Sequence, residues 1–75
     1  MRIRATKNSM KIQLNGKAKE VPEGSTIALL VELLELQPEQ VAVELNEQLV
    51  RRVERVNVQL CEADRVEMVT LVGGG

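Results

Sequence analysis

Histidine, phenylalanine, tyrosine and tryptophan are absent from this 75-residue sequence, and cysteine occurs once, as Cys61. Without imidazole the chain has neither a histidine general base nor a histidine metal ligand. A single thiol forms no internal disulfide and no cysteine-rich zinc site. Without aromatic rings the chain lacks the stacking surfaces that hold single-stranded nucleic acids. These absences exclude the usual catalytic triads, histidine or cysteine metal centres and the common nucleic-acid readers, and we expect no bound metal.

Long apolar runs are missing as well. The longest is Ile27–Val31, far short of the roughly 20 residues that a membrane-spanning helix needs. No apolar segment follows the basic N-terminus, as it would in a secretory signal. We therefore expect no membrane partner and a reduced, cytoplasmic location. Cys61 has neither a base nor a second cysteine beside it, and we interpret it as a structural or incidental thiol.

The start of the chain differs in charge from the rest. Its first nine residues contain Arg2, Arg4 and Lys7 but no acid, although the whole chain has a net charge of −1. The first clear strand pattern begins at Met10, so residues 1–9 are predicted to form a disordered extension. The remaining residues are enough for one small domain. Their net negative charge disfavours an approach to nucleic-acid phosphates. We therefore expect no nucleic-acid partner.

Alternating apolar residues predict a hairpin at the start of this domain. Met10–Leu14 alternates as a half-buried strand does, and Asn15-Gly16 is typical of a type I′ turn. Lys17–Val21 then reads as the returning strand, at an edge of the sheet where its lysines discourage further pairing.

One short helix is predicted next. Ser25 or Thr26 is a suitable N-cap, and Pro38 lies where the helix must have ended. Its core stripe, with helical spacing, comprises Ile27, Leu30, Val31 and Leu34. Leu29 and Leu33 lie beside the stripe, where they either widen the core face or line a groove for a partner.

The second half of the domain reads as strands. Val41–Leu45 alternates, Asn46-Glu47 is a turn, Leu49–Val50 is a short strand, and Val56–Leu60 is extended or loop-like. Val66–Val72 is apolar at five of seven positions, which is typical of a central strand covered on both faces. A parallel pairing of this strand with the first one closes the sheet. The predicted fold is an α+β roll, a mixed sheet with one helix packed across it.

The sequence ends in Gly73, Gly74 and Gly75 directly after the predicted central strand. Three residues without Cβ make a slender thread that can enter a narrow cleft. The α-carboxylate of Gly75 can be activated by adenylation and then attacked by a nucleophile. A frayed end or a linker is the alternative interpretation of this tail.

The pattern of the whole domain is similar to that of a known family. Residues 10–75 resemble the ThiS family, the sulfur carriers of thiazole formation in thiamine biosynthesis. The resemblance is carried by Asn15-Gly16, by Thr26 before a leucine-rich helix, by the stretches 41–46 and 49–52, and by the ending 64–67 and 72–75. It implies a ubiquitin-like β-grasp domain at residues 10–72 with a flexible glycine tail at 73–75.

The resemblance also implies a function, that of a carrier acted on by enzymes and not an enzyme itself. A ThiF-like adenylating enzyme would use ATP and magnesium to convert the Gly75 carboxylate into an acyl-adenylate. Sulfur from a cysteine desulfurase, delivered as a persulfide, would displace AMP and leave a thiocarboxylate. A ThiG-like thiazole synthase would then take up the sulfur. No cofactor is expected to stay bound to the carrier.

Two turns depart from the family pattern: the one before the last strand reads Glu62-Ala63-Asp64 where the family often has glycine, and Glu47 follows Asn46 where glycine is common. Two alternatives share the fold: a MoaD-like small subunit of molybdopterin synthase, and a ubiquitin-like modifier or binding module. The MoaD-like proteins tend to be longer and often have prolines before the glycines, whereas Thr70, Leu71 and Val72 precede them here.

A partner that receives so short a tail must also contact the folded domain. Arg51, Arg52 and Arg55 form a basic cluster, which is either a solvated face or a docking patch. The residues predicted to form the docking surface are Arg51, Arg52, Arg65, Met68, Val69 and Leu71.

Overall fold

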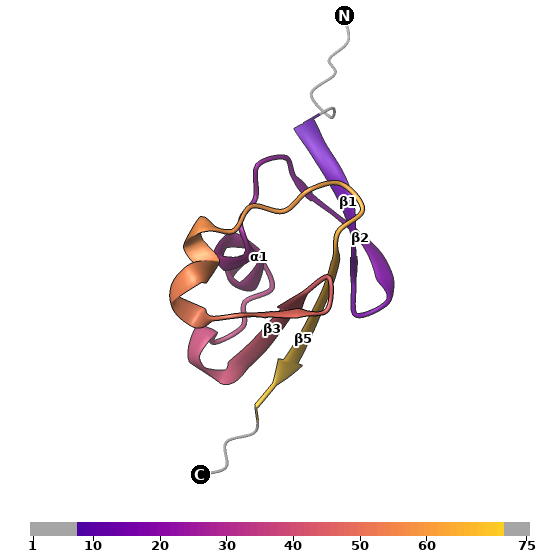
Figure 1. Ribbon diagram of the computed structural model, residues 1–75. Coiled ribbons are helices and arrows are strands. Elements are labelled where there is room, and N and C mark those ends of the chain that lie inside the picture. Colours follow the sequence, from indigo (N-terminus) through magenta and orange to yellow (C-terminus); the bar gives the residue numbers. More distant parts are fainter. Residues whose placement is uncertain (1–7, 72–75) are drawn as a thin grey trace, which may run out of the picture.

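The computed structural model describes residues 8–71, which form a five-stranded mixed sheet with one α-helix packed across it (Figure 1). The elements in chain order are β1 (Ser9–Leu14), β2 (Lys17–Pro22), α1 (Ile27–Leu33), the 3-10 turn η2 (Pro38–Gln40), β3 (Val41–Leu45), β4 (Gln48–Val50), the 3-10 helix η3 (Arg52–Asn57) and β5 (Arg65–Thr70). The strand order is β2-β1-β5-β3-β4. β5 therefore occupies the centre, parallel to β1 and antiparallel to β3, as the sequence predicts.

Two asparagines in tight turns hold β5 between its neighbours. Asn15 has a left-handed φ of 51° at the end of β1, and its side chain both accepts from the amide of Met68 (2.9 Å) and donates to the carbonyl of Met68 (3.3 Å). Asn46, with the same φ of 51°, accepts from the amide of Arg65 at 2.9 Å. Each side chain thus continues the pairing of β5 beyond the point where the adjacent strand turns away.

The helix begins and ends for local reasons. Thr26 is the N-cap, and its hydroxyl accepts from the amide of Leu29 at 3.1 Å. The helix ends at Leu33, and Glu35 follows with a left-handed φ of 58°, before Pro38 starts η2. The predicted N-cap is confirmed. Leu33 is about half exposed, so it does not widen the core face.

The core lies between α1 and one face of the sheet. Ile12, Ile27, Leu30 and Val43 are fully buried there. The other buried apolar side chains in this cluster are Met10, Val21, Val31, Val41, Leu60, Val66 and Met68. The opposite face of the sheet has no helix or strand across it among residues 8–71, and the alternation along β1 and β5 follows from this arrangement (Figure 1).

Three expectations need correction. β5 is central but is covered on one face only, because its residues alternate between buried and exposed. The segment that contains Val56 is a 3-10 helix in place of the expected extended chain. Ser9 pairs with Pro22 and the carbonyl of Asn8 accepts from the amide of Glu23, so these two residues belong to the domain and not to an extension. The rest of the expected extension, residues 1–7, lies outside the described residues.

No helix within residues 8–71 is long and apolar enough to cross a membrane.

Candidate functional site

The central strand delivers the end of the chain to one end of the sheet. β5 runs parallel to β1, and its last residues lie at the opposite end of the domain from the start of β1 (Figure 1). After Thr70 the backbone is still held, because the amide of Leu71 donates to the carbonyl of Gln40 at 2.7 Å. The predicted tail, Gly73, Gly74 and Gly75, lies outside the described residues. Its point of departure is therefore anchored on the side of β3, whereas β1 pairs only with Arg65 and Val66 at the start of β5.

Exposed apolar side chains gather on the open face of the sheet beside this point. Val69 is 61% exposed and Leu71 50% exposed, and Val69 pairs in register with the half-buried Ala42 of β3. Leu49 of β4, 68% exposed, pairs with Glu44 on the same face. We call Val69, Leu71, Ala42 and Leu49 the open-face patch. Side chains that face water on a sheet are usually polar, so these apolar residues indicate a contact surface.

The structure corrects one member of the predicted docking surface. Met68 is only 8% exposed, because it alternates with Val69 and points into the core. Leu49 was missed by the sequence analysis. Its position opposite Glu44 on the open face follows only from the pairing of β3 with β4.

The predicted arginines do not form one cluster. Arg51 is exposed and directly follows β4, whose last residue pairs with Val43, so it lies toward the patch end of the sheet. Arg65 begins β5 at the other end, where its guanidinium contacts the carboxylate of Glu47 at 3.0 Å. Arg52 pairs loosely with Glu39, with 3.9 Å between nitrogen and oxygen. Of the three, only Arg51 combines exposure, a place near the tail and no ion pair among residues 8–71.

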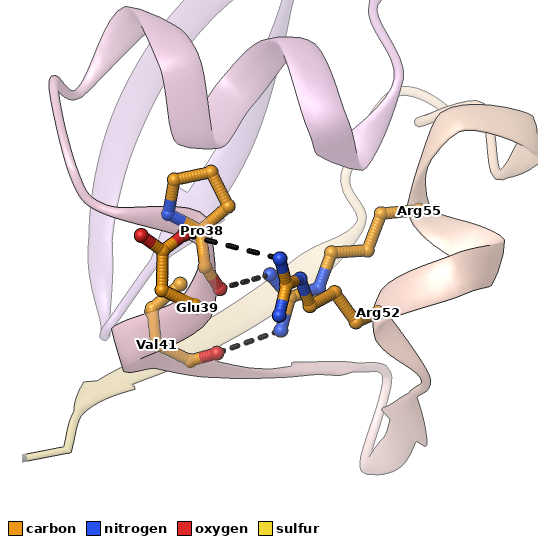
Figure 2. Close-up of polar contacts among 5 residues, drawn as sticks. All are labelled: Pro38, Glu39, Val41, Arg52 and Arg55. Atoms are coloured by element: carbon orange, nitrogen blue, oxygen red, sulfur yellow. Dashed lines mark hydrogen bonds and ion pairs between the residues drawn. The ribbon is translucent and has the colours of Figure 1, made fainter.

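Arg55, the third member of the sequence cluster, is not on a solvated face. It is 6% exposed, and its two terminal nitrogens donate to the carbonyls of Pro38 (3.0 Å) and Val41 (2.6 Å), as Figure 2 shows. Burial, and after it the nearby charge of Arg52, lowers the pKa of Arg55. The side chain joins η3 to η2 and to the start of β3. It is therefore unsuited to direct contact with a docking partner.

Cys61 is exposed at the start of the loop before β5. The backbone amide of Cys61 donates to the carboxylate of Asp64 at 2.7 Å. This contact involves the backbone and not the thiol. Within residues 8–71 no three cysteine or acidic side chains come together as ligands for a metal ion.

The two turns that depart from the family pattern keep the glycine conformation. Glu47 has φ 70° and Ala63 has φ 72°, both in the left-handed region that favours glycine. Hydrogen bonds on either side hold them there: Asn46 is bonded to Arg65, and the amide of Ala63 donates to the carbonyl of Lys11 at 2.8 Å. The two departures therefore place residues with a Cβ in backbone conformations that favour glycine, which adds local strain.

A five-stranded mixed sheet in the order β2-β1-β5-β3-β4, with one helix packed across one face, defines a ubiquitin-like β-grasp domain. The sequence profile of the ThiS family matches residues 12–75. The chain belongs to the ThiS family.

Individual relatives agree with this assignment. The chain is 37% identical over 65 residues to the sulfur carrier protein ThiS of Bacillus subtilis, covering 85% of this chain and 98% of that protein. A crystal structure of the thiamine biosynthesis protein ThiS from Geobacter metallireducens superposes with a TM-score of 0.77 at 32% identity, covering 88% of this chain and all of that one. The predicted β-grasp fold and the predicted ThiS-type sulfur carrier are confirmed, in preference to the two alternatives.

A third relative is a larger protein. The chain is 42% identical over 66 residues to a thiazole synthase of Magnetococcus marinus, which covers 88% of this chain but only 20% of the synthase. The chain thus spans a fifth of the length of that relative, whereas it matches the Bacillus carrier over nearly its whole length.

Proposed function

We propose that Gly75 carries the covalent chemistry of this sulfur carrier. A ThiF-like enzyme with MgATP converts its carboxylate into an acyl-adenylate, and the outer sulfur of a persulfide from a cysteine desulfurase displaces AMP to form an acyl disulfide. A second thiol then cleaves the S–S bond of this acyl disulfide, which releases the thiocarboxylate and leaves a disulfide between the two thiols. A ThiG-like thiazole synthase then receives the sulfur. The observation that carries the proposal is the family match, which extends through the three glycines to residue 75. The similarity to a thiazole synthase supports the choice of acceptor.

The chemistry suits the position of the tail. A carboxylate is a poor electrophile, and adenylation supplies the leaving group that a sulfur nucleophile needs. The carrier contributes no catalytic side chain to this scheme. Its task is to present one atom, and the absence of Cβ atoms in Gly73, Gly74 and Gly75 allows that atom to enter a narrow active site.

For chemistry at Gly75, the reach from Leu71 to Gly75 determines where a partner docks. Four residues follow Leu71, and a fully extended chain of that length spans at most about 14 Å. An enzyme that reaches Gly75 therefore contacts the domain around the end of β5. The open-face patch supplies apolar area there, and Arg51 supplies a rim charge for an acidic surface of the adenylating enzyme.

The covalent step is tested by intact-mass spectrometry after incubation with the adenylating enzyme, MgATP and a sulfur donor. The full chain should gain the mass expected when one oxygen is replaced by sulfur. A chain that lacks Gly74 and Gly75 should gain nothing while unfolding at the same temperature. Sulfur uptake by the shortened chain would refute the assignment of Gly75.

The docking surface is tested with charged substitutions in the patch. Val69→Asp combined with Leu71→Asp should weaken binding to the adenylating enzyme by about tenfold or more, because each places a carboxylate in a desolvated contact. Leu33→Asp is the matched control, since Leu33 is similarly exposed but lies on α1, which packs on the other face. Equal binding by the double variant and the control would place the contact elsewhere.

A further inference from the structure

A small cavity lies on the helix side of the domain, away from the open-face patch. Its volume is about 160 Å³, and it is lined by Ala28, Val31, Pro38, Arg52, Arg55 and Val56. Its walls come from α1, η2 and η3, and β3 and β4 lie between η2 and η3 in the chain. Four of the six side chains are apolar and two are guanidinium groups.

Arg55, the buried arginine of this cavity, has no counterion among residues 8–71. Arg55 is buried, and both of its terminal nitrogens donate to neutral backbone carbonyls (Figure 2). Its third donor, Nε, is buried and has no acceptor among residues 8–71, and no carboxylate of those residues lies within 4 Å of the guanidinium. Buried charges in proteins are ordinarily paired, and buried donors ordinarily find an acceptor. The guanidinium of Arg55 therefore keeps an uncompensated positive charge next to the cavity.

Arg52, the second arginine of the cavity, is exposed and only weakly paired. The side chain of Arg52 is 62% exposed, and its contact with Glu39 is 3.9 Å long, near the limit for an ion pair. Figure 2 shows Arg52 and Arg55 extending from η3 toward the same η2 segment, where Glu39 is the acid drawn beside them. Glu39 thus pairs loosely with Arg52 and does not reach Arg55. An exposed pair of this kind contributes at most about 1 kcal/mol, so a better-placed anion can displace it.

We propose that this cavity binds a carboxylate carried on a short aliphatic stem. The carboxylate replaces Glu39 as the acceptor for Arg52 and places a negative charge beside the buried guanidinium of Arg55, which it offsets without contacting Nε. The aliphatic stem lies against Ala28, Val31 and Val56. The volume is adequate, because a cavity of about 150 Å³ holds a molecule as large as benzene.

Two sources share this chemistry: a free short-chain carboxylic acid and a glutamate side chain of another protein. The probes are sodium butyrate for the first and an acetylated, amidated Gly-Glu-Gly peptide for the second. Each is titrated into the full-length ¹⁵N-labelled protein, with sodium chloride at equal ionic strength as the reference. The signals followed are the amides of η2 and η3 and the Nε–H group of Arg55.

Substitutions then locate the site. Arg52→Gln should weaken binding by about tenfold, the effect of removing one hydrogen bond to a charged group. Arg51→Gln is the matched control, because it removes the same charge one residue away and outside the cavity, and it should change binding by less than about twofold. Glu39→Gln should tighten binding by about twofold to fivefold, because it removes the competing carboxylate. Arg55 is left intact, since its variants would lose the bonds that hold η3.

The outcomes separate as follows. Saturable shifts in η2, η3 and the Arg55 Nε–H signal, with binding weakened about tenfold by Arg52→Gln, support the site. Tighter binding of butyrate assigns a free acid, and tighter binding of the peptide assigns a protein side chain. Shifts no larger than those from sodium chloride, or equal losses in the Arg51 and Arg52 variants, would overturn the proposal. None of these results depends on Gly75, so they are independent of sulfur transfer.

Discussion

Ala63 has φ 72° in the turn that leads into β5, and this strained turn offers a direct test of how the last strand is held. An L-residue in the left-handed region costs roughly 1–2 kcal/mol, because its Cβ crowds the following carbonyl. Ala63→Gly removes that cost and keeps the hydrogen bond from the residue-63 amide to the carbonyl of Lys11. The side chain is exposed, so little buried area is lost.

The gain is reduced by the unfolded state. Glycine has more conformational freedom to lose on folding, which costs about 0.4–1 kcal/mol. The difference predicts that Ala63→Gly stabilises the protein by about 0.5–1 kcal/mol. For a domain of this size, that corresponds to a rise in melting temperature of roughly 2–8 °C.

The assay is thermal unfolding by circular dichroism or calorimetry, and Ala18→Gly is its control. Ala18 is also exposed, but it lies in the extended backbone of β2, where glycine has no steric advantage. There the same substitution should destabilise by about 0.5–1 kcal/mol. The opposite signs at two exposed alanines isolate the backbone effect. If both variants melt at lower temperature than the parent, the strain argument is refuted.

Three further predictions concern the core, the thiol and the rim charge. Ile12→Ala should destabilise by about 2–5 kcal/mol in chemical denaturation, since Ile12 is fully buried; a loss below 1 kcal/mol would contradict its place in the core. Cys61→Ser should take up sulfur at the parent rate by intact mass, and a folded variant unable to do so would give the thiol a role. Arg51→Glu should slow association with the adenylating enzyme and flatten its salt dependence in stopped-flow measurements, with an unchanged melting temperature; an unchanged rate and slope would exclude Arg51 from the interface.

Local sequence determined the elements whose causes are local. The turn at Asn15-Gly16 forms because both residues tolerate positive φ, and Thr26 caps α1 because its hydroxyl reaches an amide three residues on. The ThiS pattern and the glycine ending are also properties of the linear chain. Together they predicted the β-grasp fold, the parallel closure of β1 with β5 and the carrier function.

Tertiary structure decided which side chains are available at the site. Along β5 apolar residues stand on both faces, so the sequence did not distinguish the buried Met68 from the exposed Val69; the pairing of β5 with β3 and the helix on one side did. The sequence predicted that Arg55 belongs to a basic cluster on a solvated face or a docking patch. In the structure its guanidinium is buried and donates to the carbonyls of Pro38 and Val41, which lie 17 and 14 residues away in the chain. Such contacts depend on how separate elements meet in space, because a side chain takes its surroundings from packing and not from its neighbours in the chain.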